Sequence, residues 1–200
     1  MTRRARLLAV VVVLATGAVG IISSTQTWLT VVLGGAAAHT LEVPGAAAIP
    51  VLAPLSLAVL ALGGALSIAG LVLRYLFGAL TVAIAALLAW LTASVAITRP
   101  TSAVASSVTD ATGITGEGAV GDLIAQVDAT AWPFVALVGW IALVAAGVFV
   151  LATAHRWRGS GRRYRTDAPV ASGASATAGS RPHDAIDSWD DLSRGEDPTA

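Results

Sequence analysis

Four long stretches of the chain contain no charged residue, and nearly all of the charge lies between or outside them. These stretches are Leu7–Leu41, Val43–Leu73, Tyr75–Thr98 and Ala129–His155. A helix needs about 20 apolar residues to cross the hydrocarbon core of a bilayer. The pattern therefore predicts four transmembrane helices. Their ranges are 7–24, 51–73, 76–97 and 133–154.

Composition supports a membrane protein rather than a water-soluble one. Charged residues make up 12% of the chain and hydrophobic residues 56%, whereas soluble domains carry about 25% charged residues. A soluble fold of this length could not bury so much apolar surface. The chain has no cysteine, which excludes disulfides, thiolate metal sites and thiol nucleophiles.

The arginines predict the orientation, because positive charge accumulates in cytoplasmic flanks. All basic residues are arginine, and nine of them flank the predicted helices on one side. These are Arg3, Arg4, Arg6, Arg74, Arg156, Arg158, Arg162, Arg163 and Arg165. Only Arg99 lies on the other side, so we expect a multi-pass plasma-membrane protein with both termini in the cytoplasm. The alternative of a cleaved signal peptide is disfavoured, because the first apolar run is long and no clean A-x-A site follows it.

Two outer segments connect the helices. The first predicts a β-hairpin, with Trp28–Leu33 and His39–Val43 joined across a glycine pair. The second predicts a short amphipathic helix, since Val120, Leu123, Ile124 and Val127 recur at helical spacing. A GxGxxG pattern at residues 116–121 lacks the βαβ context of a dinucleotide site, and His39 with Glu42 is too sparse to predict a metal or acid–base pair.

The predicted spans contain no ionisable side chain. Such residues usually mark proton relays and intramembrane active sites, so we expect no enzyme activity, no cofactor and no metal, and no nucleic-acid partner. Small residues in the first two spans predict close helix contacts. These are Gly17, Gly20, Gly63, Ser67 and Gly70. Trp90 and Trp140 fall at similar depth and are placed to meet, either as core packing or as an aromatic pocket.

The C-terminal region divides into two parts beyond the transmembrane domain, which we place at residues 1–158. Residues 159–183 predict a disordered linker rich in Ala, Ser, Gly and Pro. Residues 184–200 form an acidic motif in which Ile186, Trp189 and Leu192 recur every three residues. With Gly195, Asp197 and Pro198, these residues are our candidate partner-binding set, of the kind that docks into a partner's groove. The alternative is a solvated acidic tail.

Three segments resemble one known family. The terminal run WDDLSRGEDPT, Trp189–Thr199, resembles the closing W-D-x-L-x-x-G-x-D-P-T of the actinobacterial tryptophan-biosynthesis-associated membrane proteins. The Ser23–Trp28 run resembles that family's Ser-Ser-Gln-x-Trp segment, with Thr25 as an extra residue and Thr27 where proline is common. Residues 162–164 resemble its juxtamembrane Arg-Arg-Tyr. In the tail, Asp191 and Ser193 replace the usual Ala and Asp.

The resemblance covers the whole chain and implies a gene near tryptophan-synthesis genes, but it supplies no catalytic residues. The expected fold class is an all-α membrane protein with four transmembrane helices, a small outer β-hairpin, a short amphipathic outer helix and a disordered cytoplasmic C-terminal tail. Besides the lipid bilayer, we expect a cytosolic protein partner recruited through the tail. The alternative function is a transporter or exporter of tryptophan or an indole-like metabolite, which with four spans would need a homo-oligomer.

Overall fold

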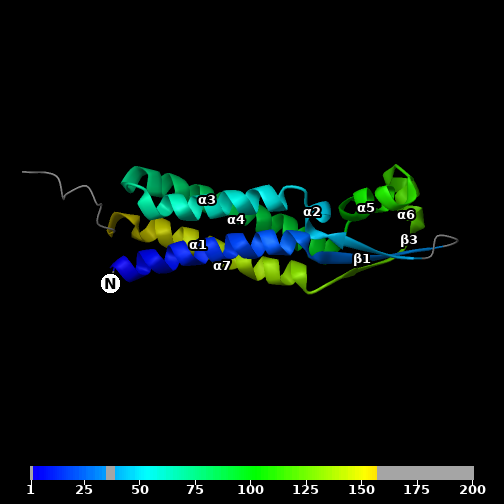
Figure 1. Cartoon of the computed structure of the whole chain (residues 1–200), viewed down its shortest axis with the longest axis horizontal. Helices are drawn as coiled ribbons and strands as arrows, with labels where there is room; N and C mark the ends of the chain where they lie inside the picture. Colours follow the sequence, from blue (N-terminus) through cyan, green and yellow to red (C-terminus); the bar gives the residue numbers. More distant parts are fainter. Residues whose placement is uncertain (1, 35–38, 157–200) are drawn as a thin grey trace, which may run out of the picture. The chain divides into compact units, whose positions relative to one another are not determined.

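The structure is a computed structural model that describes residues 2–34 and 39–156, which belong to one compact unit. Four long helices run side by side, and a small sheet with shorter helices lies at one end of them (Figure 1). The long helices are α1 (Thr2–Thr25), α3 (Leu52–Ile68), α4 (Leu71–Thr98) and α7 (Trp132–Thr153). The short elements are β1 (Thr27–Leu33), β2 (Thr40–Pro44), α2 (Gly45–Ala48), α5 (Ser102–Thr112), α6 (Glu117–Leu123), β3 (Ile124–Ala129) and the 3-10 helix η2 (Ala154–Arg156).

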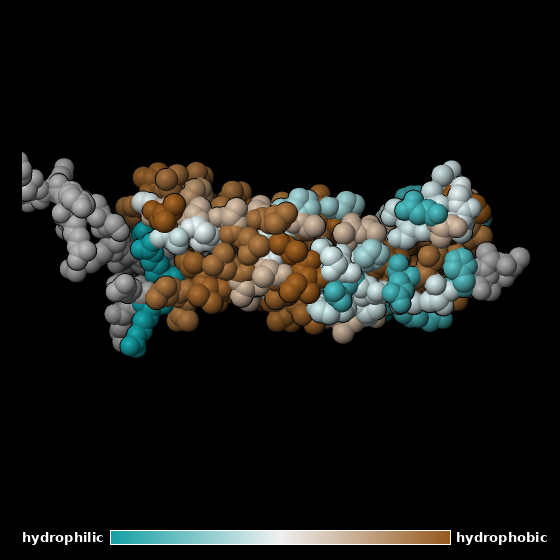
Figure 2. All heavy atoms as spheres, viewed as in Figure 1, coloured by the Kyte–Doolittle hydropathy of each residue, from teal (hydrophilic) through white to brown (hydrophobic). Residues whose placement is uncertain are grey.

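Three of the long helices have the length and apolar composition to cross a membrane, namely α1 from Arg4 onward, α4 and α7. The fourth, α3, is apolar but has only 17 residues. Helix α1 packs against α3 and α7, and α4 packs mainly against α7. The surface along these helices is mostly apolar, and polar residues gather toward the two ends of the described unit (Figure 2).

Glycines allow the close helix approaches that the sequence predicts. A methyl group on Gly63 of α3 would lie 2.8 Å from Cδ2 of Leu14 on α1, and one on Gly17 would lie 2.9 Å from Cγ of Leu60. Gly70 does not belong to this seam, because it is exposed and a methyl group on it would meet nothing within 4 Å. Ser67 is exposed as well, but its carbonyl accepts a hydrogen bond from Arg6 of α1. The prediction of a small-residue helix contact is therefore correct for Gly17, Gly20 and Gly63 and wrong for Gly70.

The corner between α3 and α4 lies earlier than predicted. We expected the second span to reach residue 73 and Arg74 to lie in the link, but α3 ends at Ile68 and α4 already begins at Leu71. Gly70 follows the last turn of α3, where a residue of low helix propensity ends a helix readily. Arg74 is instead inside α4 and only 2% exposed, which is possible because its guanidinium bonds to helix-end carbonyls.

The predicted hairpin is confirmed and belongs to a larger sheet. Strand β1 pairs antiparallel with β2, and it also pairs antiparallel with β3, giving the order β2-β1-β3. Leu29, Val31 and Leu33 of β1 are buried on one side, together with apolar residues of β2 and α5. The fold is therefore mostly helical, and its small sheet contains the predicted hairpin and one further strand, β3.

The predicted amphipathic helix is half correct. Residues 117–123 are helical as α6, but Ile124 and Val127 belong to strand β3. The segment also alternates polar and apolar residues from Gln126 to Ala129, as a half-buried strand does. The open edge of β1 decides between the two patterns, because it provides backbone partners for this segment. Helix α5 was not predicted, although its buried Val104 and Val108 are spaced four apart.

Candidate functional site

The six candidate partner-binding residues of the tail lie outside the described residues. These are Ile186, Trp189, Leu192, Gly195, Asp197 and Pro198. Their docking role stays a prediction. The candidate sites among the described residues lie in the helices and the three-stranded sheet.

Trp140 lies at the centre of the helix bundle, where all four long helices meet. Its side chain is 1% exposed, and its Nε1–H donates a hydrogen bond to Thr92 Oγ1 of α4 at 3.1 Å. On the other side the ring lies against α1, since a methyl group on Gly20 would come within 2.5 Å of Trp140 Cη2 and would also meet Ser56 of α3. The indole is thus enclosed, and its one polar group is satisfied.

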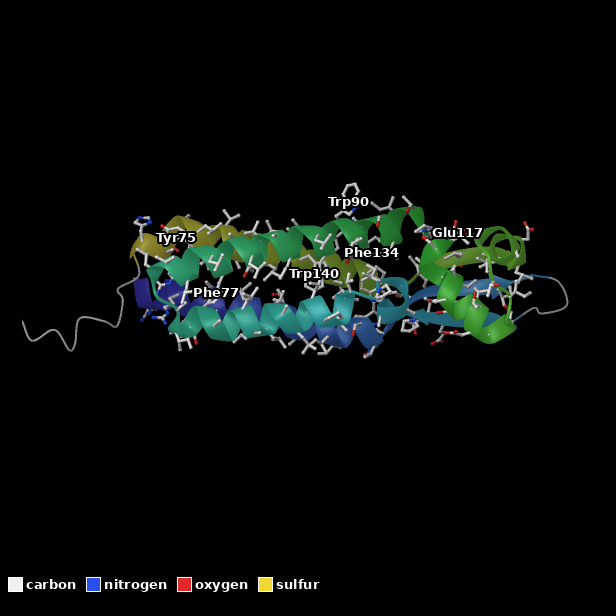
Figure 3. All side chains as sticks on the ribbon, turned by 90° about the horizontal axis from the view of Figure 1, so that it is seen from above. Tyr75, Phe77, Trp90, Glu117, Phe134 and Trp140 are labelled. Atoms are coloured by element: carbon white, nitrogen blue, oxygen red, sulfur yellow. The ribbon has the colours of Figure 1, made fainter. Side chains whose placement is uncertain are left out.

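Trp90 does not join Trp140. Its side chain is 73% exposed and points away from the bundle, whereas the ring of Trp140 lies between the helices (Figure 3). Trp90 precedes Thr92 by two residues, which places it about 200° around α4 from the side chain that Trp140 contacts. The two rings match in depth but lie on different faces, so the predicted meeting and the aromatic pocket are not formed.

The junction between α1 and the sheet is built by the Ser23–Trp28 run. Trp28 is fully buried, and its Nε1–H donates to the carbonyl oxygen of Ser23 at 2.9 Å and to Ser23 Oγ at 3.0 Å. Gly45 lies against the same indole, where a methyl group would come within 2.7 Å of Nε1. The Gly45 backbone N–H also donates to the carbonyl of Gln26 at 3.0 Å. This motif therefore fixes the turn from helix to strand.

An open cleft of about 260 Å³ lies where α3 begins and α4 ends. Its walls are apolar apart from the hydroxyl groups of Ser94 and Ser102. Ser94 Oγ already donates to the carbonyl of Leu91 at 2.7 Å. The lining has no charged side chain, and it combines apolar side chains with polar groups.

The exposed face of the sheet carries an acidic row. Thr30 of β1 is the register partner of Glu42 on β2 and of Asp128 on β3, so the two carboxylates flank one hydroxyl. Thr27 Oγ1 donates to Glu42 Oε2 at 2.9 Å, and Gln126 Nε2 donates to Asp128 Oδ2 at 2.7 Å. Within residues 2–34 and 39–156, no group of three or more His, Asp or Glu side chains is placed to hold a metal ion.

Two arginines donate hydrogen bonds to backbone carbonyls at the end of the bundle that lies away from the sheet. The guanidinium of Arg74 donates to the carbonyl of Ala69 at 2.9 Å and to the carbonyl of Ala154 at 3.1 Å. These carbonyls lie at the C-terminal ends of α3 and α7, where the helix dipole favours a cation. Arg6 donates to the carbonyl of Ser67. Sequence reasoning missed this role of Arg74, and its one signal was a single charge placed one turn after Gly70.

A family model described as "Tryptophan-associated transmembrane protein" matches residues 10–199. No curated protein and no solved structure matches the chain.

Proposed function

Because the chain belongs to the family of tryptophan-associated transmembrane proteins, we propose that it acts in the plasma membrane by binding and regulating a cytosolic partner, without catalysis of its own. The tail, residues 184–200, is the proposed recruiting segment. A tryptophan-biosynthesis enzyme is the partner we expect. The observation that carries this proposal is the extent of the family match, which includes the tail together with the membrane helices.

The proposed topology has four spans with both termini in the cytoplasm. Strands β1 and β3 share one sheet, which supports placing the end of α1 and the start of α7 on the same side of the membrane. Helix α4 also ends toward this side, with three residues between its end and the start of α5. If α1 and α4 both cross toward the sheet, the chain has to return between them, and α3 is the apolar helix available for that return. Its 17 residues are at the lower limit of about 17 for a spanning helix.

The centre of the bundle supports an anchoring role better than a transport role. A stacking site for indole needs an accessible aromatic face, but Trp140 is enclosed and Trp90 points outward. The Trp140 N–H is already bonded to Thr92, so a ligand could use it only by breaking that bond. Transport of tryptophan or an indole-like metabolite, which would require a homo-oligomer, therefore remains the less favoured function.

Co-purification tests the recruiting role. Tagged full-length protein is purified in mild detergent beside a variant lacking residues 184–200 and a control lacking residues 167–183, which removes the same length of chain from the linker. We expect a tryptophan-pathway enzyme to accompany the full-length chain and the linker deletion, and to be lost with the terminal deletion. Trp189→Ala should reproduce that loss. The same set of proteins in all four samples would overturn the proposal.

A flux assay separates the alternative. Liposomes containing Trp140→Leu and Trp90→Leu variants are compared with wild type for tryptophan and indole movement. We expect no protein-dependent flux in any sample. Flux that appears with wild type and disappears with the Trp140 variant would favour transport instead.

A further inference from the structure

A second cleft opens between α1 and α3, at the end of the bundle where the chain begins. It has a volume of about 240 Å³ and is lined by Arg6, Leu7, Val10 and Ser67. Arg6 forms the polar end of the cleft together with Ser67, whose carbonyl accepts a hydrogen bond from Arg6 Nη2. Leu7 and Val10 form an apolar wall that continues toward the middle of the bundle. The lining thus combines one guanidinium with hydrocarbon.

The charge at this end is strongly one-sided. Arg6 of α1 and Arg74 of α4 are both cations and repel each other electrostatically, and Arg4 precedes Arg6 on α1. The sequence places no Asp or Glu in α1, α3, α4 or α7. Repulsion between cations is strong where the dielectric constant is low. An anion beside Arg6 would relieve that repulsion.

In the proposed topology, the cleft lies at the depth of lipid headgroups. The first apolar span begins at Arg4, so Arg6 is within one turn of its end, where long arginine side chains reach toward the membrane–water interface. Val10 follows Arg6 by four residues, which places it about 6 Å deeper along the helix. A phosphate at Arg6 would therefore direct its attached acyl chain along Leu7 and Val10.

We propose that this cleft binds an anionic phospholipid, whose phosphate is held by Arg6 and whose acyl chain lies along Leu7 and Val10. Arginine suits this role because its planar guanidinium donates two parallel hydrogen bonds to phosphate oxygens. The apolar wall favours a lipid over a free phosphate, since a free anion makes no use of it. The bound lipid would extend the contact between α1 and α3 at the membrane surface.

Native mass spectrometry of the full-length protein tests this proposal. The protein is released from nanodiscs of phosphatidylglycerol or of phosphatidylcholine, and the lipid that stays bound is counted. We expect one phosphatidylglycerol to survive activation that removes phosphatidylcholine. Arg6→Gln should lower the bound fraction about tenfold or more, as expected for loss of a charged hydrogen bond. Arg4→Gln, which removes the same charge outside the cleft lining, should leave the bound fraction unchanged.

A second variant separates the cleft from the charge. Val10→Trp fills the cleft and keeps both arginines, so we expect it to release the lipid even if Arg6→Gln disturbs folding. Inorganic phosphate is added as a competitor to identify the source of the anion. Displacement of the lipid by millimolar phosphate would overturn the assignment to a lipid. Equal retention of both lipids, or equal retention by the Arg6 and Arg4 variants, would mean a nonspecific lipid shell and would also overturn it.

Discussion

The contact between α4 and α7 predicts opposite effects for the same substitution at two glycines of one helix. A methyl group on Gly147 would lie 2.6 Å from Cγ2 of Val82 and 3.3 Å from the Val82 backbone nitrogen. A methyl group on Gly139 would meet nothing within 4 Å. Both glycines are inside α7, so Gly→Ala brings the same gain in helix propensity at each. The difference between the two variants therefore measures the contact with α4.

The expected magnitudes follow from two terms. Replacing a helical glycine with alanine stabilises by about 1 kcal/mol, and we expect this gain at Gly139. Overpacking costs about 1–3 kcal/mol, and Val82 cannot easily turn away because a helical valine has one strongly preferred rotamer. Gly147→Ala should therefore be about 0–2 kcal/mol less stable than wild type. The two variants should differ by about 1–3 kcal/mol.

The free energy of unfolding is measured by reversible unfolding in mixed detergent micelles, with far-ultraviolet circular dichroism as the signal. Val82→Ala in the Gly147→Ala background should recover part of the lost stability, because it removes the methyl group that the new side chain meets. If Gly147→Ala is as stable as Gly139→Ala, the two helices do not approach as closely as described, and the reasoning fails.

Three further predictions concern other parts of the molecule. Thr92→Val leaves the Trp140 N–H without its acceptor. In the same unfolding assay, we expect it to destabilise the bundle by about 0.6–1.7 kcal/mol, the range for hydrogen bonds between membrane helices. An unchanged unfolding midpoint would contradict this prediction. Arg74→Met should lower the free energy of unfolding by about 1.5–3 kcal/mol, as expected for a lost charged hydrogen bond, and Arg74→Lys should lower it by less. If the Arg74→Met variant is as stable as wild type, Arg74 does not hold the two helix ends together. Cysteines that replace Thr30 and Asp128 should form a disulfide on oxidation, since these positions are register partners. A cysteine pair shifted by one residue in β3 should not form one. The reverse result would mean that residues 124–129 do not pair with β1 in this register.

The apolar runs were sufficient to predict the long helices, because a helix that crosses a bilayer needs a long uninterrupted run of apolar residues. The hairpin was also predictable, since β-branched residues flank a glycine pair within one short segment. Strand β3 was not, because the helical spacing of Val120, Leu123, Ile124 and Val127 overlaps the short alternation from Gln126 to Ala129. Its partner, β1, is about 100 residues away in the sequence, and local patterns contain no information about such a partner.

The candidate sites show the same limit. Depth in the membrane follows from counting residues, and it placed Trp90 and Trp140 at matching levels. The face of the helix on which a side chain lies depends on how the helix packs against its neighbours. Trp90 is exposed whereas Trp140 is buried, so the two rings are apart. Arg74 was assigned to a link because a charge within an apolar run usually marks its end. Its burial depends on carbonyls at the ends of α3 and α7, which only the folded bundle brings together.

The sheet also imposes an order on the synthesis and insertion of this protein. Its central strand β1 emerges directly after α1, but one of its two neighbours, β3, is made only after α4 and α5. The hydrogen bond from Thr130 Oγ1 to the carbonyl of Thr27 joins residues 103 positions apart. One edge of β1 therefore stays unpaired until residues 124–129 have been made and have come to lie beside it. In the proposed topology, closure of the sheet marks the moment at which both segments that form it lie on the same side of the membrane. A protease that cleaves unpaired extended segments would distinguish chains before and after that moment.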